Sequence, residues 1–268
     1  FFYNSDITKK RVEKSKIKKN IFPDIKHHCG QFYGYDLVAG ETLYKKNNTS
    51  IFNELLNWLH KSVWTSEKIE SKYIKDSCYK FYKEKTNSRL KLFFDKYPII
   101  NQELPVNGES VPSINSILEL LPWNNLFNGI ATFIHGDLQF DNIIGISKKK
   151  FKLLDWRPTF GDSKTIGDQY YDFAKLLGGL EINYDLVKKN KFSYDINKSK
   201  ILLKIPTRKK SNNLINFFEK YLEKNNYDLK KVKILTGLIF LNMSPLHHEP
   251  FDKLLFFYGK YYLQKNLY

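Results

Sequence analysis

The chain has 268 residues, of which 42% are hydrophobic and 16% aromatic, so it can bury the core of one large domain or of two modest ones. It contains no run of about 18 apolar residues and no secretory signal at its start, which argues against a membrane span and predicts a soluble, cytoplasmic protein. Its 44 Lys and Arg against 28 Asp and Glu give a net charge of +16, which attracts anions, but the lysines are scattered and predict a solvated surface rather than a polyanion groove.

The cysteine and histidine patterns do not indicate a metal site. Cys29 and Cys78 form no Cys-x-x-Cys pair and have no histidine at a metal-ligand spacing, so we interpret both as unpaired thiols in a reducing compartment. Two pairs of adjacent histidines occur at residues 27–28 and 247–248. Adjacent side chains on one helix or strand point in different directions, so neither pair predicts metal ligation.

The first third of the chain predicts helices around one short strand. Residues 7–19 carry apolar side chains at helical spacing among many charges and predict a basic amphipathic helix. Residues 31–38 are aromatic and β-branched between glycines, which predicts a strand that runs into a connector. A further helix is predicted from residue 50, with Thr49 or Ser50 available as its cap.

The middle of the chain predicts a β-hairpin between helices. Helices are expected over residues 78–96 and 114–121, each ended by a proline. An apolar run at residues 131–134 enters a loop, and residues 143–146 and 151–154 predict two short strands around a turn. We expect these strands and their loops to bring together Asp137, Asn142 and Asp155.

The remainder of the chain predicts helices with wide apolar faces. One should follow Gly167-Asp168 and be broken at Gly178-Gly179, and others should cover residues 213–223, 230–241 and 251–263. The sequence therefore predicts an α+β protein whose larger part is mostly helical.

The chemistry-bearing segment is HGDLQFDN at residues 135–142, followed after the hairpin by Asp155-Trp156. Phosphoryl transfer needs a positioned acceptor hydroxyl, a carboxylate to receive its proton, and a divalent metal on the nucleotide phosphates. Asp137, Asn142 and Asp155 supply the oxygen ligands that Mg²⁺ prefers, and the interval from Asp137 to Asn142 equals that of the kinase loop H-R-D-x-x-x-x-N. Gly136 replaces the arginine of that loop, which points away from protein kinases.

These residues resemble the aminoglycoside phosphotransferase and choline kinase family, whose signature is H-G-D-x-x-x-x-N followed by a strand ending in D-W or D-F. Residues 167–174 are similar to the G-D-P-x-Y-D-L-A segment of the family, and residues 35–43 are similar to its interlobe connector. The resemblance implies a protein-kinase-like two-lobe fold. Residues 1–43 would be the remnant of an incomplete small N-terminal lobe with the connector, and residues 44–268 a mostly helical C-terminal lobe containing the catalytic β-hairpin.

The resemblance also implies roles for particular residues. Asp137 would be the catalytic base toward the acceptor hydroxyl, and Asn142 and Asp155 would be the magnesium ligands. His135 would be structural and orient the loop. Asp172 would cap a helix and brace the catalytic loop.

The nucleotide-binding side of the family pattern is incomplete in this chain. No glycine-rich phosphate loop precedes residue 35, and no strand carries the lysine that pairs with the α- and β-phosphates. We expect that part of the small lobe to lie before Phe1, where an additional domain is a further option. Glu13 is our candidate for the acid that pairs with the lysine. The connector would contact the adenine of ATP through the backbone of Tyr35, Asp36, Leu37 and Val38.

The sequence thus predicts an ATP- and Mg²⁺-dependent phosphotransferase that acts on a hydroxyl of a small metabolite, such as a sugar or an amino alcohol like choline. The acceptor pocket should lie among residues 51–96 and after residue 176, and the positive field disfavours a polycationic aminoglycoside. Two alternatives stay open. One is a kinase-like binding or regulatory module without a phosphate loop, and the other, suggested by charge alone, is a basic nucleic-acid-binding protein, although we do not expect nucleic acid as a partner.

Overall fold

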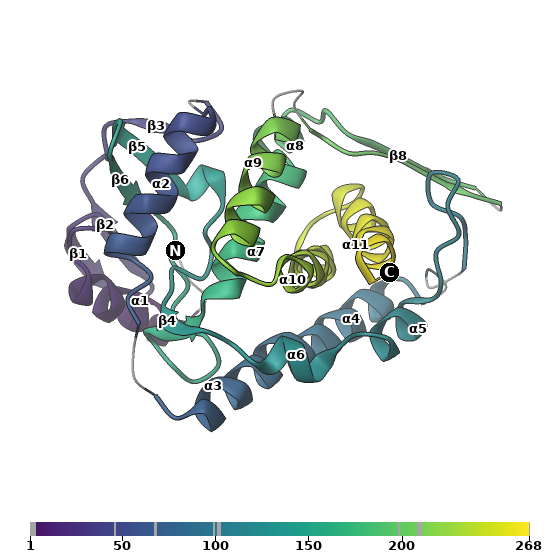
Figure 1. The fold of residues 1–268 in the computed structure, drawn as a ribbon, viewed down its shortest axis with the longest axis horizontal. Coiled ribbons are helices and arrows are strands. Elements are labelled where there is room, and N and C mark those ends of the chain that lie inside the picture. Colours follow the sequence, from purple (N-terminus) through teal and green to yellow (C-terminus); the bar gives the residue numbers. More distant parts are fainter. Residues whose placement is uncertain are drawn as a thin grey trace. The chain divides into compact units, whose positions relative to one another are not determined.

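The computed structural model describes residues 4–45, 47–66, 69–98, 100, 103–197, 199–207 and 211–267 (Figure 1). The chain forms two compact units, the first made of residues 1–77 and 129–176 and the second of residues 78–128 and 177–268. These units do not coincide with the two expected lobes, because the chain before residue 43 groups with the segment that carries HGDLQFDN. The division into lobes at residue 43 stays a prediction. In the described residues, no helix is both long and apolar enough to cross a membrane.

The first unit combines helices with short antiparallel sheets. Its helices are α1 (Ser5–Ile17), α2 (Thr49–Ser62), α3 (Ser71–Cys78, which ends at the unit boundary), the 3-10 turn η2 (Phe140–Asn142) and the first two turns of α7 (Gln169–Glu181). Its strands are β1 (Ile25–Cys29), β2 (Phe32–Tyr35), β3 (Glu41–Thr42), β4 (Ala131–Phe133), β5 (Ile143–Ser147), β6 (Lys150–Leu153) and β7 (Ile166–Asp168).

The strands pair in three groups, and two of these groups flank the loop of residues 134–142, which runs from β4 to β5. β5 and β6 form the predicted hairpin, with β3 along the other edge of β5, while β4 pairs with β7 and β1 with β2. Gly40 leads into β3 with a φ of 152°, and a Cβ there would lie 2.6 Å from the backbone oxygen of Gly145. The glycine of the predicted connector is therefore needed for close approach of the chain to the hairpin.

Helix α2 shows how local sequence sets an element and its buried face. Asn48 begins the helix, and its side-chain oxygen accepts a hydrogen bond from the Ile51 amide at 2.9 Å. The predicted caps Thr49 and Ser50 are wrong, since both already lie in the helix and the cap is Asn48, one residue before Thr49. The apolar side chains at three- and four-residue spacings, Phe52, Leu55, Leu56 and Leu59, are all buried.

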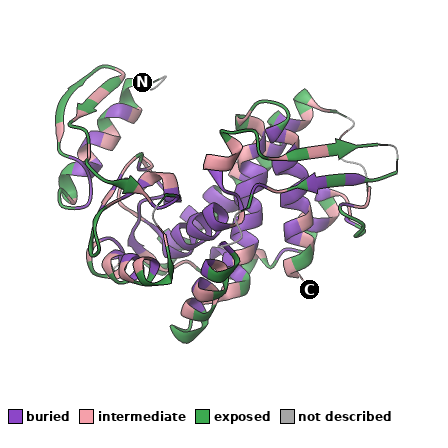
Figure 2. Cartoon of the chain, turned by 90° about the horizontal axis from the view of Figure 1, so that it is seen from above, coloured by how far each residue is buried: buried purple, intermediate pink, exposed green. Residues whose placement is uncertain are grey.

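The second unit is mostly helical. Its elements are the π-helix η1 (Tyr79–Glu84), α4 (Lys85–Lys96), α5 (Ile114–Glu119), α6 (Trp123–Phe127), the end of α7, α8 (Tyr184–Val187), the strands β8 (Ser193–Ile196) and β9 (Ile201–Lys204), α9 (Ser211–Lys224), α10 (Leu229–Met243), the 3-10 turn η3 (Ser244–Leu246) and α11 (Phe251–Leu267). Figure 2 shows burial concentrated in the long helices, whereas β8 is mostly exposed.

Two glycines allow α10 and α11 to pack closely in the core of the second unit (Figure 1). A Cβ on Gly237 would lie 2.7 Å from the side chain of Leu263 on α11, and a Cβ on Gly259 would lie 3.0 Å from the side chain of Leu241 on α10. Each glycine thus receives a leucine from the facing helix. This reciprocal contact brings the two helices together, and both are buried over most of their length.

Helix α7 differs from the sequence prediction, because the break expected at Gly178-Gly179 is wrong. The helix continues through both glycines to Glu181. A Cβ on Gly178 would lie 3.5 Å from the ring of Phe240, which is ordinary contact. Burial against α10 in the second unit compensates for the low helix propensity of the two residues.

Candidate active site

The loop of residues 134–142 joins β4 to β5, and His135 anchors it to Leu154, the residue that follows the second strand of the hairpin. The His135 side chain is fully buried, its Nε2 donates to the Leu154 carbonyl oxygen at 2.8 Å, and its Nδ1 accepts from the Asp137 amide at 3.2 Å. Burial lowers the pKa of the imidazole to about 3. The ring is therefore neutral at physiological pH, and its two hydrogen bonds join the Asp137 amide to the Leu154 carbonyl oxygen through the imidazole.

Asp172 on α7 holds the backbone at the start of the same loop. Its two carboxylate oxygens accept hydrogen bonds from the amides of His135 at 2.9 Å and Gly136 at 2.8 Å, and from Trp64 Nε1 at 3.0 Å. Burial raises the pKa of the Asp172 carboxyl, and these three donors oppose that effect. The first turn of α7 is hydrogen-bonded by Asp168, whose side chain accepts from the Tyr170 amide at 3.1 Å.

Gly136 lies between His135 and Asp137 and has no room for a side chain. Its φ is +84°, and a Cβ would lie 2.7 Å from Cβ of Arg157. Arg157 in turn donates from Nε to the Gly136 carbonyl oxygen at 3.3 Å, and its amide donates to the His135 carbonyl oxygen at 3.0 Å. The glycine that distinguishes this loop from H-R-D is thus required by the close approach of Arg157.

Asp137 lies at the centre of the site and is ion-paired. Lys175 on α7 places its Nζ 2.7 Å from Asp137 Oδ1, and its side chain is only 5% exposed. Burial opposes ionisation of Asp137, but the positive charges of Lys175 and Arg157 outweigh it and hold the pKa of the carboxyl at about 2. Asp137 is therefore a carboxylate at neutral pH.

Asn142 and Asp155 are brought to the same region by the hairpin. Asn142 Nδ2 donates to the Asp137 carbonyl oxygen at 2.9 Å, and the Asn142 carbonyl oxygen accepts from the Leu154 amide at 2.8 Å, one residue before Asp155. Asp155 has a φ of +56°, an uncommon conformation for a residue with a side chain, and its side chain is 63% exposed. Strained backbone of this kind is frequent at functional sites because the surrounding structure must hold it.

These donors fit a magnesium ion. The described hydrogen bonds of the Asn142 side chain use Nδ2, which leaves its Oδ1 as a neutral oxygen donor, and Asp155 adds an exposed carboxylate. In the part of the chain that the structure describes, no group of three or more His, Cys, Asp or Glu side chains could hold a metal ion. Binding of a magnesium ion by Asn142 and Asp155, with its other ligands from nucleotide phosphates and water, stays a prediction.

Helix α1 contacts three consecutive residues that begin with Asp155. Arg11 places a guanidinium nitrogen 2.8 Å from Asp155 Oδ1, and its carbonyl oxygen accepts from Trp156 Nε1 at 2.9 Å. Lys14 is buried and donates from Nζ to the Arg157 carbonyl oxygen at 3.0 Å, and burial lowers the pKa of its ammonium group. The Trp156 side chain is fully buried.

Glu13 lies on α1 but outside these contacts. Its carboxylate forms an ion pair with Lys164 at 2.6 Å, and its side chain is 37% exposed. Lys164 follows the hairpin in sequence and is not the lysine that the family pattern requires. The expected pairing of Glu13 with a phosphate-binding lysine stays a prediction.

The predicted adenine-binding connector follows β2. Tyr35 ends that strand with its ring 6.1 Å from the ring of Tyr33, and Asp36 lies 3.8 Å from Lys26. Leu37 is 97% exposed, and Val38 is half-buried. The exposed Leu37 side chain leaves apolar surface available to a ligand. Contact of this segment with adenine stays a prediction.

Sequence reasoning missed the cations and the tryptophan that hold the site. Lys175 could have been found, because it follows Asp172 by three residues on a predicted helix and so shares its face. Arg11 and Lys14 come from α1 and Trp64 from the segment that follows α2, all far away in the sequence, and no local pattern signals their contacts with the site.

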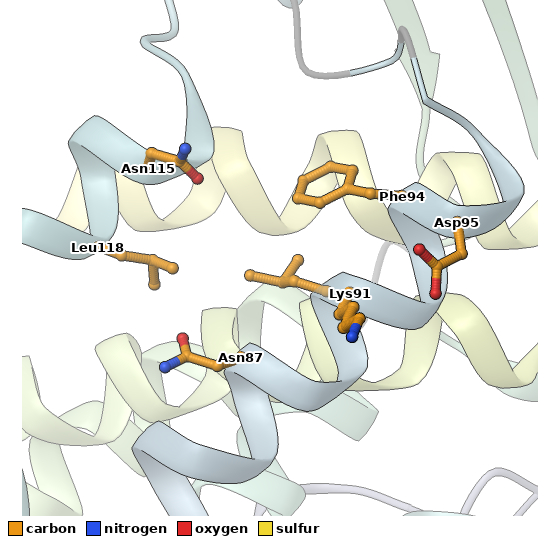
Figure 3. A pocket seen from close by; sticks show the side chains of 7 residues that line it. Asn87, Lys91, Phe94, Asp95, Asn115 and Leu118 are labelled. Atoms are coloured by element: carbon orange, nitrogen blue, oxygen red, sulfur yellow. The ribbon is translucent and has the colours of Figure 1, made fainter.

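A cavity of about 300 Å³ lies in the second unit, where α4 faces α5 (Figure 3). Its lining combines polar, charged and apolar side chains: Asn87, Leu90, Lys91, Phe94, Asp95, Asn115 and Leu118. Part of this lining falls within residues 51–96, where the acceptor pocket was expected. No predicted catalytic or metal-binding residue lines it, so the location of the acceptor pocket stays a prediction.

Comparison with known proteins identifies the fold. No protein-family model matches the sequence, and neither does any curated protein. Among solved structures, the ADP-bound aminoglycoside phosphotransferase APH(2'')-Ib aligns over 98% of this chain and 81% of its own, with 14% identity and a TM-score of 0.50. An ethanolamine kinase from Plasmodium vivax aligns over 98% of this chain and 72% of its own, with 16% identity and a TM-score of 0.47. A choline kinase from Cryptosporidium parvum aligns over 97% of this chain and 75% of its own, with 16% identity and a TM-score of 0.40.

The chain therefore has the protein-kinase-like fold of the aminoglycoside phosphotransferase, with many helices and small sheets. The sequence resemblance to the aminoglycoside phosphotransferase and choline kinase family is confirmed at the level of the fold.

Proposed function

We propose that this protein is a small-molecule kinase that transfers the γ-phosphoryl group of ATP to a hydroxyl of a small metabolite. The observation that carries the proposal is the arrangement of Asp137, Asn142 and Asp155. Asn142 Nδ2 donates a hydrogen bond to the Asp137 carbonyl oxygen, and the Asn142 carbonyl oxygen accepts one from the amide of Leu154, which precedes Asp155. The fold supports the same reaction class, and the ADP bound to the aminoglycoside phosphotransferase supports a nucleotide as phosphoryl donor.

The chemical role of Asp137 follows from its charge. As the acceptor oxygen forms its bond to phosphorus, the bond from phosphorus to the ADP oxygen breaks, and the acceptor proton passes to the Asp137 carboxylate. A carboxyl whose pKa is about 2 is a weak base. Asp137 would therefore contribute by orienting the hydroxyl and receiving its proton late, once bond formation to phosphorus has made that proton acidic.

Asn142 and Asp155 would hold Mg²⁺, which supplies neutralisation of the charge on the nucleotide phosphates. The connector of residues 35–38 would contact the adenine. His135 and Asp172 would not touch substrate, because both side chains are fully buried. Their part is to fix the backbone from which Asp137 projects.

The acceptor class follows from charge. A net charge of +16 repels polycations, so we propose a neutral or anionic hydroxyl compound such as a sugar, with a monocationic amino alcohol such as choline as the next candidate. This ordering is independent of the identity of the acceptor pocket.

The test is turnover of ATP with Mg²⁺ against a panel of sugars and amino alcohols. We expect Asp137→Asn to lower kcat by about 100-fold to 10,000-fold, because general base catalysis contributes a factor of that order. Asp141→Asn serves as the matched control, since Asp141 neighbours the motif but occupies none of its functional positions. Circular dichroism would show that both variants are folded. Equal rates for the Asp137→Asn and Asp141→Asn variants would exclude the proposed role.

A binding or regulatory module is the second candidate, and one contact favours it. Arg11 occupies one oxygen of the proposed metal ligand Asp155 at 2.8 Å. Calorimetry distinguishes the two functions. A kinase should bind ATP more tightly when Mg²⁺ is added and should consume it, whereas a module would bind nucleotide without turnover and without a response to Mg²⁺.

A further inference from the structure

One helix holds both ends of the His135-Gly136-Asp137 tripeptide. Asp172 accepts the first two amides, and Lys175, three residues further along α7, contacts the carboxylate of the third residue. Residues at this spacing lie on the same face of a helix. The helix therefore fixes the backbone of the loop through one side chain and the direction of its reactive carboxylate through the other.

The contact between Lys175 and Asp137 is strong for physical reasons. The Lys175 side chain is only 5% exposed, and an ammonium group buried to that degree is costly unless it is paired. Its Nζ lies 2.7 Å from Asp137 Oδ1, a charge-assisted distance. Turning Asp137 away would therefore remove the carboxylate that compensates the buried Lys175 charge.

The contacts treat the two oxygens of Asp137 unequally. Oδ1 receives Lys175 at 2.7 Å and Gln139 Nε2 at 3.3 Å. Oδ2 has a longer contact, 3.5 Å from Asn142 Nδ2. Among the contacts described for this carboxylate, Oδ1 is thus occupied by the protein and Oδ2 is the oxygen better able to accept a further hydrogen bond.

We infer that Lys175 is a positioning residue for phosphoryl transfer: by binding Asp137 Oδ1 it presents Asp137 Oδ2 to the acceptor hydroxyl. This inference rests on the proposed function. The proton released from the acceptor as its oxygen bonds to phosphorus goes to Oδ2. Lys175 itself exchanges no proton and touches no substrate, so its effect is on the orientation of the carboxylate.

The main test is Lys175→Met, which keeps the length of the side chain and removes its charge. We expect kcat to fall by about 100-fold, the effect of misplacing a reacting group by about 1 Å, with KM for ATP changed less than about threefold. Lys175→Ala supplied with methylammonium or ethylammonium should regain part of the lost rate as the amine concentration rises. A residue that only supports folding would show neither the selective loss of kcat nor the rescue.

Lys231→Met is the matched control. Lys231 is also a buried lysine on a helix, but it lies in the second unit and donates from Nζ to the Asn128 carbonyl oxygen at 2.7 Å. We expect this variant to lower the unfolding midpoint and to leave kcat of the folded protein near the wild-type value. A folded Lys175→Met protein with kcat within about threefold of wild type would overturn the inference.

A second measurement is independent of turnover. Urea unfolding of the wild type, Lys175→Met, Asp137→Asn and the double variant forms a double-mutant cycle, which reports whether the two side chains are coupled in the folded protein. Additive effects would overturn the inference even if the enzyme is active. Absence of turnover in the wild type on every acceptor, with coupling present, would instead reject the proposed function.

Discussion

His135 shows how one buried side chain makes stability depend on pH. Burial lowers the pKa of its imidazole to about 3 in the folded protein, whereas an exposed histidine titrates near about 6.5. Below about pH 6.5 the unfolded chain binds a proton that the folded protein excludes, so the free energy of unfolding falls as pH decreases towards 3. The contribution of His135 is fully present above pH 6.5.

We predict that this single group costs about 2 kcal/mol of stability between pH 7.5 and pH 5, at about 1.4 kcal/mol per pH unit below its unfolded pKa. Urea unfolding across that range should show a shallower pH dependence for His135→Gln than for the wild type. His27→Gln, at an exposed position on β1, controls for the substitution itself. Parallel profiles for the wild type and His135→Gln would contradict the prediction.

At the scale of single residues, the sequence predicted only those site residues that belong to a motif with a recognisable spacing. Asp137, Asn142 and Asp155 were predicted to lie close together because a short hairpin separates them, and the structure places them on that hairpin and its loop. Arg11 could not be predicted, because its contact with Asp155 depends on how α1 packs. Long-range contacts of this kind follow from tertiary structure rather than from local pattern.

At the scale of elements, α7 shows that packing can override low local helix propensity. Glycine lowers helix propensity by about 1 kcal/mol, and this rule predicted a break at Gly178-Gly179. The helix continues because its end is buried in the second unit, where Gly178 faces Phe240. The cost of the glycines is therefore still present in the folded protein and should be recoverable by substitution.

We predict that Gly178→Ala stabilises the protein by about 0.5 to 1 kcal/mol, since its Cβ would meet Phe240 at an ordinary 3.5 Å. Gly237→Ala makes the same change in α10 but should destabilise by about 1 to 3 kcal/mol, because its Cβ would overlap Leu263 at 2.7 Å. Urea unfolding of both variants measures the two signs. Destabilisation by both would mean that the end of α7 has no room for a methyl group.

Strands were harder to predict than helices, and the reason lies in their sequences. β5 and β6 are apolar and bounded by a polar turn, so the hairpin was predicted. The helices α9, α10 and α11 were predicted from their wide apolar faces. β1 has the sequence IKHHC and is largely exposed, and β8 is exposed at three of its four residues. Strands without an alternating apolar face give no periodic signal.

At the scale of the whole molecule, the net charge of +16 is the property that most invites a different function. Several of the charges are paired with acids, as in Lys26 with Asp24, Lys164 with Glu13 and Lys253 with Glu249. The run of residues 148–150 lies exposed at the turn of the hairpin of β5 and β6. Such charges attract any polyanion at low salt, which by itself does not make a binding site.

We therefore predict that the protein binds RNA and DNA only as a nonspecific polycation. Fluorescence polarisation with short oligonucleotides should show binding at about 20 mM salt that weakens linearly on a logarithmic salt scale, because affinity comes from released counterions. Near 150 mM salt, the Kd should be no tighter than the nonspecific range of about 1 to 100 µM and should be the same for unrelated sequences. A submicromolar Kd at that salt concentration, or a clear preference for one sequence, would require base contacts beyond charge. Either result would make nucleic-acid binding a leading candidate for the function of the protein.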